Sequence, residues 1–217
     1  MFKMNPGSLF VVSTPIGNLK DITYRAIDVL KEVEYIVCED SRITKRLLDK
    51  YNISRKMITY NEYNEIKKTD SIIKILTNGL DVALVSDAGT PCISDPGYRL
   101  ISKIKEENCE ISVIPVPGAS ASTSSLSISG LPSDSFYFIG FLPKKKGRQK
   151  KIKEMKDYQG SVIIYESPLR ISRTLSDLFS ILGNRRVFII REMTKIYEES
   201  HFTDLKSINS EKVKLIH

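Results

Sequence analysis

The sequence predicts an α/β protein whose first part forms an open parallel sheet with helices on both faces. Apolar runs of β type alternate with helical patterns over roughly the first 120 residues. The runs are continuous in Val, Ile and Leu, which is typical of strands that are buried on both faces. Strand–helix repetition at this spacing favours a doubly wound sheet. With 217 residues, 41% of them hydrophobic, the chain is long enough for one large or two small domains.

The elements of the first part follow in order along the chain. The expected strands are Leu9–Ser13, Tyr35–Glu39, Met57–Tyr60, Asp81–Ser86 and Ile111–Val116. The expected helices cover residues 22–33, 41–51, 64–78 and 96–108. Asp21, Asp95-Pro96 and Ser167-Pro168 have the residue types that begin helices, whereas Gly79 and Gly183-Asn184 have those that end them.

The composition changes after Val116. A stretch rich in Ala, Ser and Gly predicts a short helix of small residues and a turn at Gly130–Pro132. A second series of strands is expected at Phe136–Leu142, Ser161–Glu166 and Arg186–Arg191. We therefore expect two domains, 1–133 and 134–217, the second being a smaller α/β domain with a mixed sheet.

Charge is distributed unequally between the two parts. Residues 1–143 hold 16 basic and 17 acidic residues, whereas residues 144–217 hold 17 basic and 9 acidic ones. The net charge of +7 therefore comes from the second part, and such an excess indicates either an anionic partner or a solvated basic face.

Several functional classes find no support in the sequence. No apolar run approaches the length of a membrane helix, and the N-terminal apolar run predicts a strand and not a signal peptide. The three scattered cysteines predict reduced thiols and a cytoplasmic location. Two histidines without a cysteine cluster predict no metal site. Neither a GxGxxG fingerprint nor a P-loop is present.

Three turns of small residues follow expected strands, at residues 13–18, 86–91 and 117–121. Ligands of open parallel sheets bind beyond the carboxyl ends of the strands. Each turn alone is explained by chain reversal, but three on one edge favour a nucleoside-sized ligand.

Seven motifs in order resemble one known family. They are STPIGNLKDIT (13–23), CEDSRITKRLL (38–48), SDAGTPCISDPG (86–97), VPGASA (116–121), GFLPKKKGRQK (140–150), YESPLRI (165–171) and REMTKIYEE (191–199). Together they resemble the ribosomal RNA small subunit methyltransferase I family of the tetrapyrrole-methylase superfamily.

The resemblance implies a two-domain tetrapyrrole-methylase-like fold and a homodimer, with S-adenosylmethionine bound between the domains. It also implies methyl transfer to the 2′-oxygen of a cytidine in the decoding region of 16S rRNA. The residues that match the cofactor loops of the family are Pro15, Asp87, Ala88, Gly89, Ile93, Ser120, Ala121 and, from the second domain, Leu142.

The chain departs from the family pattern at three places. Leu169 stands where the family usually has histidine, and Asn61 and Tyr63 replace histidines of a second segment. The chain also ends at His217, short of the usual end, which predicts an incomplete second domain.

A ribose hydroxyl is a poor nucleophile, so a base or a stabilising charge is expected beside it. The candidates for this catalytic role are Glu39, Asp40, Arg42, Glu166 and Lys195, with Asp87, Arg191 and Glu192 as further charged groups of the expected cleft. Arg42 and Lys195 alternatively hold phosphate. The segment 144–153 carries seven positive charges and is expected to be a flexible loop that binds the RNA backbone through Lys144, Lys145, Lys146 and Arg148.

Two alternatives remain open from the sequence. One is a methyltransferase that acts on a tetrapyrrole, whose carboxylates are also anionic. The other is an inactive, truncated relative that binds RNA.

Overall fold

The computed structural model describes residues 5–107 and 110–210. The chain forms two compact units, one extending to Ser120 and the other beginning at Ala121. The sequence placed this boundary after residue 133. The two differ because helix α5 (Ala121–Ile128) groups by its contacts with the second unit.

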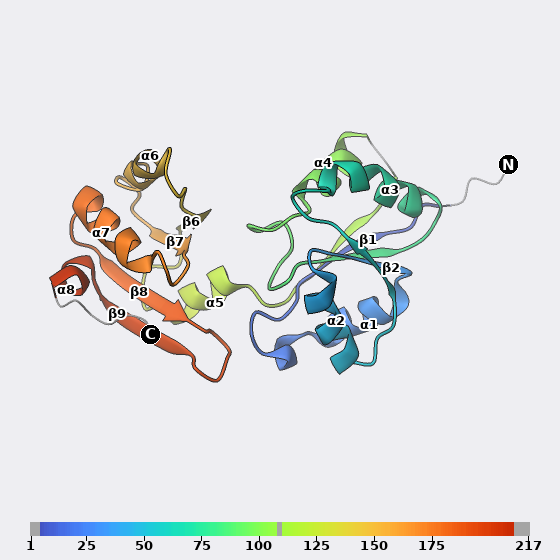
Figure 1. Ribbon diagram of the computed structural model, residues 1–217, viewed down its shortest axis with the longest axis horizontal. Coiled ribbons are helices and arrows are strands. Elements are labelled where there is room, and N and C mark those ends of the chain that lie inside the picture. The colour runs from blue at the N-terminus through green and yellow to red at the C-terminus, as the bar shows by residue number, and fades with distance from the viewer. Residues whose placement is uncertain (1–4, 108–109, 211–217) are drawn as a thin grey trace. The chain divides into compact units, whose positions relative to one another are not determined.

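The first unit is a five-stranded parallel sheet with helices on both faces (Figure 1). The strand order is β3-β2-β4-β1-β5. The strands are β1 (Leu9–Val12), β2 (Tyr35–Cys38), β3 (Lys56–Thr59), β4 (Val82–Val85) and β5 (Val113–Val116). The helices are α1 (Tyr24–Glu32), α2 (Ser41–Lys50), α3 (Glu65–Thr77) and α4 (Tyr98–Glu106), with a short 3₁₀ helix at Leu19–Asp21. The predicted doubly wound sheet is thereby confirmed.

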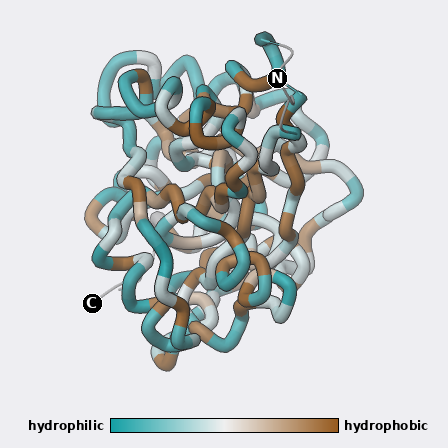
Figure 2. The backbone as a smooth tube through the Cα atoms, turned by 90° about the vertical axis from the view of Figure 1, so that its right-hand side faces the viewer, coloured by the Kyte–Doolittle hydropathy of each residue, from teal (hydrophilic) through white to brown (hydrophobic). Residues whose placement is uncertain are grey.

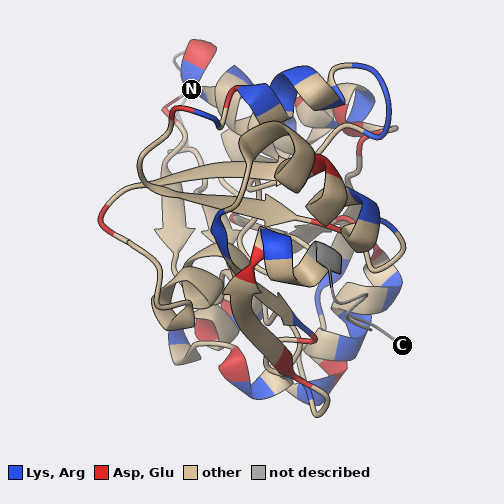
Figure 3. Cartoon of the chain, turned by 90° about the vertical axis from the view of Figure 1, so that its left-hand side faces the viewer, with Lys and Arg blue, Asp and Glu red and all other residues tan. Residues whose placement is uncertain are grey.

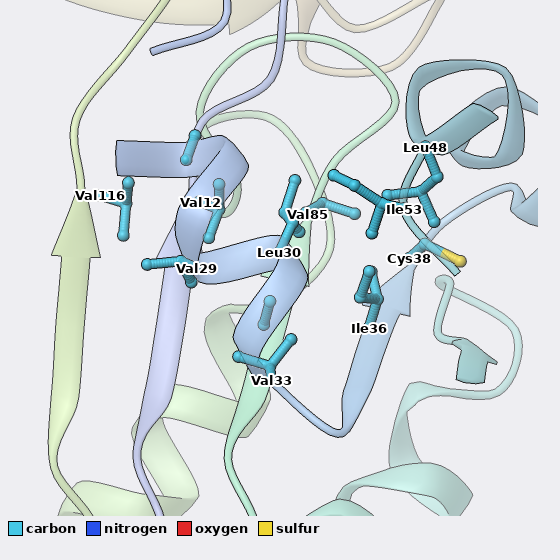
Figure 4. Packing of buried hydrophobic residues seen from close by; sticks show 12 residues of the cluster. Val12, Val29, Leu30, Val33, Ile36, Cys38, Leu48, Ile53, Val85 and Val116 are labelled. Atoms are coloured by element: carbon cyan, nitrogen blue, oxygen red, sulfur yellow. The ribbon is translucent and has the colours of Figure 1, made fainter. Parts of the chain in front are cut away.

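Side chains alternate between the two faces of this sheet, and each face has its own core. On one face Val12, Val85 and Val116 of the strands meet Val29 and other apolar residues of α1 (Figure 4). Apolar residues of α3 and α4 cover the opposite face. In Figure 2 brown stretches, which mark hydrophobic residues, alternate with teal hydrophilic ones along the trace. Because both faces of the sheet are buried, the strands require the continuous apolar runs seen in the sequence.

Three helix starts differ from the sequence-based expectation. The N-cap of α1 is Thr23, whose hydroxyl accepts the amide of Ala26, because the segment ending at Asp21 forms the 3₁₀ turn. Helix α4 begins only after Gly97, at φ 128°, so Asp95-Pro96 lies outside it. Helix α7 (Ile171–Leu182) begins after a turn at residues 168–170 and has no side-chain cap, so Ser167-Pro168 does not begin it.

The second unit contains two small sheets where one mixed sheet was expected. Strands β6 (Phe136–Phe141) and β7 (Ser161–Tyr165) form a parallel pair, and β8 (Arg186–Arg191) and β9 (Glu199–Asp204) an antiparallel pair. Helix α7 and helix α8 (Leu205–Ser210) contribute to a third apolar core. The sequence did not predict β9, because its residues, ESHFTD, lack a run of apolar residues.

The basic segment 144–153 is not a loop throughout. Its second half forms helix α6 (Arg148–Lys153), and Gly147 precedes it at φ 83°. Charged residues colour helices and loops in Figure 3, whereas the strands of the large sheet are almost entirely tan. Within residues 5–107 and 110–210, no helix has both the length and the apolar character that crossing a membrane requires.

Candidate functional site

The loops after β4, β1 and β5 meet at one edge of the large sheet. These strands are neighbours, and Val12 is in register with both Val85 and Val116. Since all three strands run parallel, their following loops begin at the same level. The structure therefore brings together the three turns that the sequence singled out.

Backbone hydrogen bonds join the first two of these loops. The Thr14 amide donates to the Gly89 carbonyl at 2.9 Å, and the Gly89 amide donates back to the Thr14 carbonyl at 3.0 Å. The buried Thr14 hydroxyl also donates to the carbonyl of Ser86 at 3.0 Å, and the Ser86 hydroxyl donates to Gly89 at 3.1 Å. These contacts satisfy the polar groups of a buried loop crossing and fix its conformation.

Side-chain contacts add the third loop to the other two. The hydroxyls of Ser13 and Thr90 are 3.0 Å apart, and Thr90 donates to the carbonyl of Ala119 at 3.3 Å. A Cβ atom on Gly118 would lie only 3.0 Å from the Cβ atom of Ser13. Hydrogen bonds thus brace the three loops against one another, and the close approach of Ser13 favours glycine at position 118. The hydroxyl contacts from Ser13, Thr14 and Thr90 were not predicted from the sequence, because each joins residues at least 29 positions apart in the chain.

The segment 89–97 has an unusual backbone. Gly89 adopts φ 86°, and Cys92 and Ser94 adopt left-handed conformations at φ 70° and 65° although they carry side chains. Non-glycine residues in this region store strain and cluster at functional sites. Gly97 is required here, since a Cβ atom would lie 2.7 Å from the Cys92 sulfur.

Carboxylates gather at the same edge. Asp87 Oδ1 accepts the backbone amide of Asp40 at 3.0 Å, which joins the loops after β2 and β4. Burial raises the pKa of Asp87, and the charge of Asp40 raises it further. Burial and the Asp87 charge likewise raise the pKa of Glu39. Burial, with the charges of Glu39 and Asp87, raises the pKa of Asp95 to about 6. The edge is therefore a negative environment that favours a cationic ligand.

Asp40 and Arg42 are paired with each other. Arg42 donates to both carboxylate oxygens of Asp40, with Nη2 at 2.6 Å from Oδ2 and Nε at 3.0 Å from Oδ1. These hydrogen bonds hold the pKa of Asp40 at about 2. Asp40 also caps α2 by accepting the amide of Arg42. Such a carboxylate is a weak base, so Asp40 fits the structural role better than the catalytic one.

The residues predicted to bind the cofactor lie in both units. Pro15 is buried, whereas Ala88 and Ile93 are exposed beside the braced loops. Ser120 directly precedes α5, and Ala121 is its first residue. Leu142 belongs to the second unit, where its side chain is buried in the core. The contact between Leu142 and the cofactor stays a prediction.

Two residues predicted to act on the RNA are instead internal. Arg148 is only 5% exposed, with Nε donating to Asp177 at 2.8 Å and Nη2 to Thr174 at 2.8 Å. The side chain of Glu166 is 4% exposed and accepts from Thr174 and Arg170. The assignment of Arg148 to RNA contacts is therefore wrong, because its donors are used inside the protein. Both carboxylate oxygens of Glu166 likewise have partners inside the protein, and its role as a base stays a prediction.

The other charged candidates lie on the surface. Lys144, Lys145 and Lys146 are exposed, as predicted for phosphate contacts. Lys195 lies in the turn between β8 and β9 and pairs with Glu192 at 3.1 Å. Arg191 pairs with Glu199 at 2.7 Å. Exposed pairs of this kind are weak, so Lys195 remains available to a partner. Within the described ranges, no cluster of three or more His, Cys, Asp or Glu residues has an arrangement that suits a metal ion.

Comparisons with known proteins agree with these motifs. Residues 8–209 match the model of the tetrapyrrole (corrin/porphyrin) methylases. The ribosomal RNA small subunit methyltransferase I of Halalkalibacterium halodurans is 52% identical over 89% of this chain and 66% of its own length. The protein of the same name from Thermotoga maritima is 47% identical over 89% of this chain and 86% of its own length. This chain thus spans about two thirds of the first relative and most of the second.

A solved structure supports the fold independently. The methyltransferase CobJ superimposes with a TM-score of 0.70 at 17% identity, covering 92% of this chain and 87% of its own. At this identity the likeness shows the fold alone, whereas the identity to the two curated relatives extends over nearly the whole chain. The chain therefore belongs to the tetrapyrrole methylase family, among the ribosomal RNA small subunit methyltransferase I proteins.

Proposed function

We propose that this protein transfers a methyl group from S-adenosylmethionine to the ribose 2′-oxygen of a cytidine in the decoding region of 16S rRNA. The observation that carries the proposal is the braced edge formed by the loops after β4, β1 and β5. The two relatives described above, which are 52% and 47% identical to this chain, bear the name of a small-subunit rRNA methyltransferase. The cytoplasm, where ribosomes are modified, is the location that this function implies.

The chemistry of the edge fits this cofactor. S-Adenosylmethionine supplies a methyl group on a positively charged sulfonium and also carries an ammonium group. Burial raises the pKa values of Glu39, Asp87 and Asp95, and the charge of a neighbouring carboxylate raises each of them further, so a cation beside them relieves that repulsion. Asp87 uses Oδ1 for the Asp40 amide, and a carboxylate can accept further hydrogen bonds from an amine or a hydroxyl.

The chain's own residues would act mainly by positioning. Direct displacement requires the attacking oxygen in line with the S–CH₃ bond at roughly 3–3.5 Å. Loops held by several hydrogen bonds lose little entropy when they hold a ligand in such a geometry. Glu39 and Asp87 are the candidates for accepting the hydroxyl proton, because their raised pKa values make them better bases than Asp40.

The second unit would supply the RNA contacts. Lys144, Lys145 and Lys146 lie exposed in the segment between β6 and α6. Phosphate contacts of lysine position an RNA without reading its sequence. A homodimer is part of the proposal, on the resemblance to the family.

The decisive experiment compares acceptors. Purified protein is incubated with labelled S-adenosylmethionine and either small ribosomal subunits lacking the modification, naked 16S rRNA or uroporphyrinogen. The proposal predicts label in the RNA at a ribose 2′-position, located by primer extension at limiting nucleotide concentration. Label in the tetrapyrrole alone would replace the proposed substrate. Failure to bind S-adenosylmethionine in calorimetry would support an inactive relative.

A further inference from the structure

A cluster of buried charges lies where β6 and β7 end. Phe141 and Tyr165 are paired in register at the last position of these parallel strands. The next residues, Leu142 and Glu166, therefore begin two neighbouring loops. One of them continues into the exposed lysines and the other into Arg170. Two motifs that are more than 20 residues apart in the sequence thus meet at one edge.

Glu166 is the centre of this cluster. Its Oε1 lies 2.6 Å from Nη2 of Arg170, and its Oε2 accepts the hydroxyl of Thr174 at 2.7 Å. Its side chain is 4% exposed, so both carboxylate oxygens are satisfied by protein groups and not by water. A buried carboxylate is tolerated only with such partners.

Arg148 completes the cluster from the side of α6. Its guanidinium donates to Thr174 and to Asp177, both at 2.8 Å, and its Nη1 lies 3.9 Å from Glu166. Thr174 therefore bridges Arg148 and Glu166. Two arginines face two carboxylates, so the cluster as a whole is neutral.

The remaining donors of both arginines reach the backbone of the lysine segment. Nη1 of Arg170 lies 3.3 Å from the carbonyl of Leu142, and Nη1 of Arg148 lies 3.4 Å from the carbonyl of Pro143. These are the carbonyls of the two residues before Lys144. The planar fork of arginine can hold a carboxylate and a carbonyl at once, which a lysine ammonium on a flexible stem does less well.

We propose that Arg148, Glu166 and Arg170 are positioning residues that hold the segment 142–146 in the conformation in which its lysines contact RNA phosphates. The inference rests on the proposed function, because RNA is the partner of that segment. Under this proposal Arg148 and Glu166 position the lysine segment. Arg148 does not contact the RNA, and Glu166 does not contact the reacting hydroxyl. The cluster orders the segment before RNA binds, so the three lysines lose less conformational entropy on binding.

The test uses Arg148→Lys and Arg170→Lys, which keep the charge and remove the fork. Arg173→Lys is the matched control, since Arg173 is 70% exposed and lies 3.9 Å from the same Asp177. Affinity for 16S rRNA or small subunits is measured across a salt series, with calorimetry of S-adenosylmethionine in parallel. Each cluster variant is expected to weaken RNA binding about tenfold while the salt dependence stays unchanged, because all lysines remain. Arg173→Lys should bind like the wild type.

A second measurement separates positioning from overall stability. Hydrogen exchange of the amides of residues 144–147 should be faster in both cluster variants than in Arg173→Lys, at a temperature where circular dichroism shows every variant folded. Thr174→Val, which keeps side-chain volume, should reproduce the effect if an arginine variant does not fold. Unchanged exchange in this segment, or unchanged RNA affinity together with a lower Tm, would overturn the inference.

The same experiment distinguishes this inference from the proposed function. If the wild type binds no RNA, the proposed function fails and the role toward RNA fails with it. The exchange data still decide whether the cluster orders the segment. If the wild type binds RNA and the exchange rates do not change, only the positioning role is wrong.

Discussion

Oδ1 of Asp87 accepts the backbone amide of Asp40 at 3.0 Å, so one carboxylate joins the loops that follow β2 and β4. The side chain of Asp40 is turned to Arg42, whereas Asp87 is left among other carboxylates. Two aspartates in direct contact thus have opposite pKa shifts, and only one of them suits a cationic ligand.

Replacement of Asp87 by Asn should weaken S-adenosylmethionine binding by about tenfold to a hundredfold, because a hydrogen bond to a charged group is lost. The amide oxygen of Asn can still accept the Asp40 amide, so the Tm should change little. Calorimetry and thermal unfolding measure the two effects. Asp70→Asn removes an exposed carboxylate that pairs with Lys103 on the surface, and it should leave binding unchanged. Equal affinities of both variants would exclude Asp87 from the site.

Replacement of Asp95 by Asn should stabilise the protein above pH 6. The pKa of Asp95 is about 6 in the folded chain, against 3.8 for the unperturbed group. The folded state therefore holds its proton more tightly, and stability falls as pH rises from about 4 to 6. We expect Asn to restore about 1 kcal/mol at pH 7.5 and almost nothing at pH 4, after allowance for solvent screening.

Urea unfolding at both pH values measures this difference. Asp49→Asn, which removes an exposed partner of Lys45, serves as the control and should change stability by no more than about 0.5 kcal/mol at either pH. A stability gain for Asp95→Asn that is the same at pH 4 and pH 7.5 would contradict the proposed cause.

Replacement of Gly89 by Ala tests the braced loops. Gly89 has φ 86°, and a Cβ atom would lie 3.4 Å from Ile16. The variant should lose about 1 kcal/mol of stability from the left-handed backbone, and S-adenosylmethionine should bind at least about tenfold more weakly. Gly183→Ala is the matched control, because Gly183 has φ 75° with no atom within 4 Å of the new Cβ, at the end of α7. The control should lose stability and keep its affinity for the cofactor.

Removal of the three exposed lysines tests the RNA contacts. The triple variant Lys144→Ala, Lys145→Ala, Lys146→Ala should bind 16S rRNA more weakly and lower the slope of log K against log salt by about 2, at roughly 0.7 per phosphate contact. The control variant replaces three exposed lysines of α3, Lys67, Lys68 and Lys74. Because both variants lose the same charge, equal slopes would show that the effect comes from net charge and not from this segment.

Much of the first unit was predictable from local sequence. Continuous apolar runs are required of strands buried on both faces, and the five predicted strands form in the predicted places. Helix ends marked by glycine were also correct, as at Gly79 and Gly183, since few other residues adopt their backbone conformations. Helix starts were less predictable: Thr23 and Asp21 are both good caps, and the 3₁₀ turn that ends at Asp21 decides which one is used.

The candidate site was also predictable only in part. Its loops were recognisable, because small residues that follow strands form a local pattern. The partners of individual charges were not recognisable. Arg148 stands among lysines in the sequence, and its partners Thr174 and Asp177 follow more than 20 residues later.

The sequence by itself determined the parallel sheet, the loop-bearing edge and the family, because periodicity and motifs are properties of short segments. Only the tertiary structure decided which charges face solvent and which are buried in pairs. Burial depends on which strands pair, such as β6 with β7. Arg148 and Glu166 were expected to contact ligands, but in the folded chain they belong to an internal network of ion pairs.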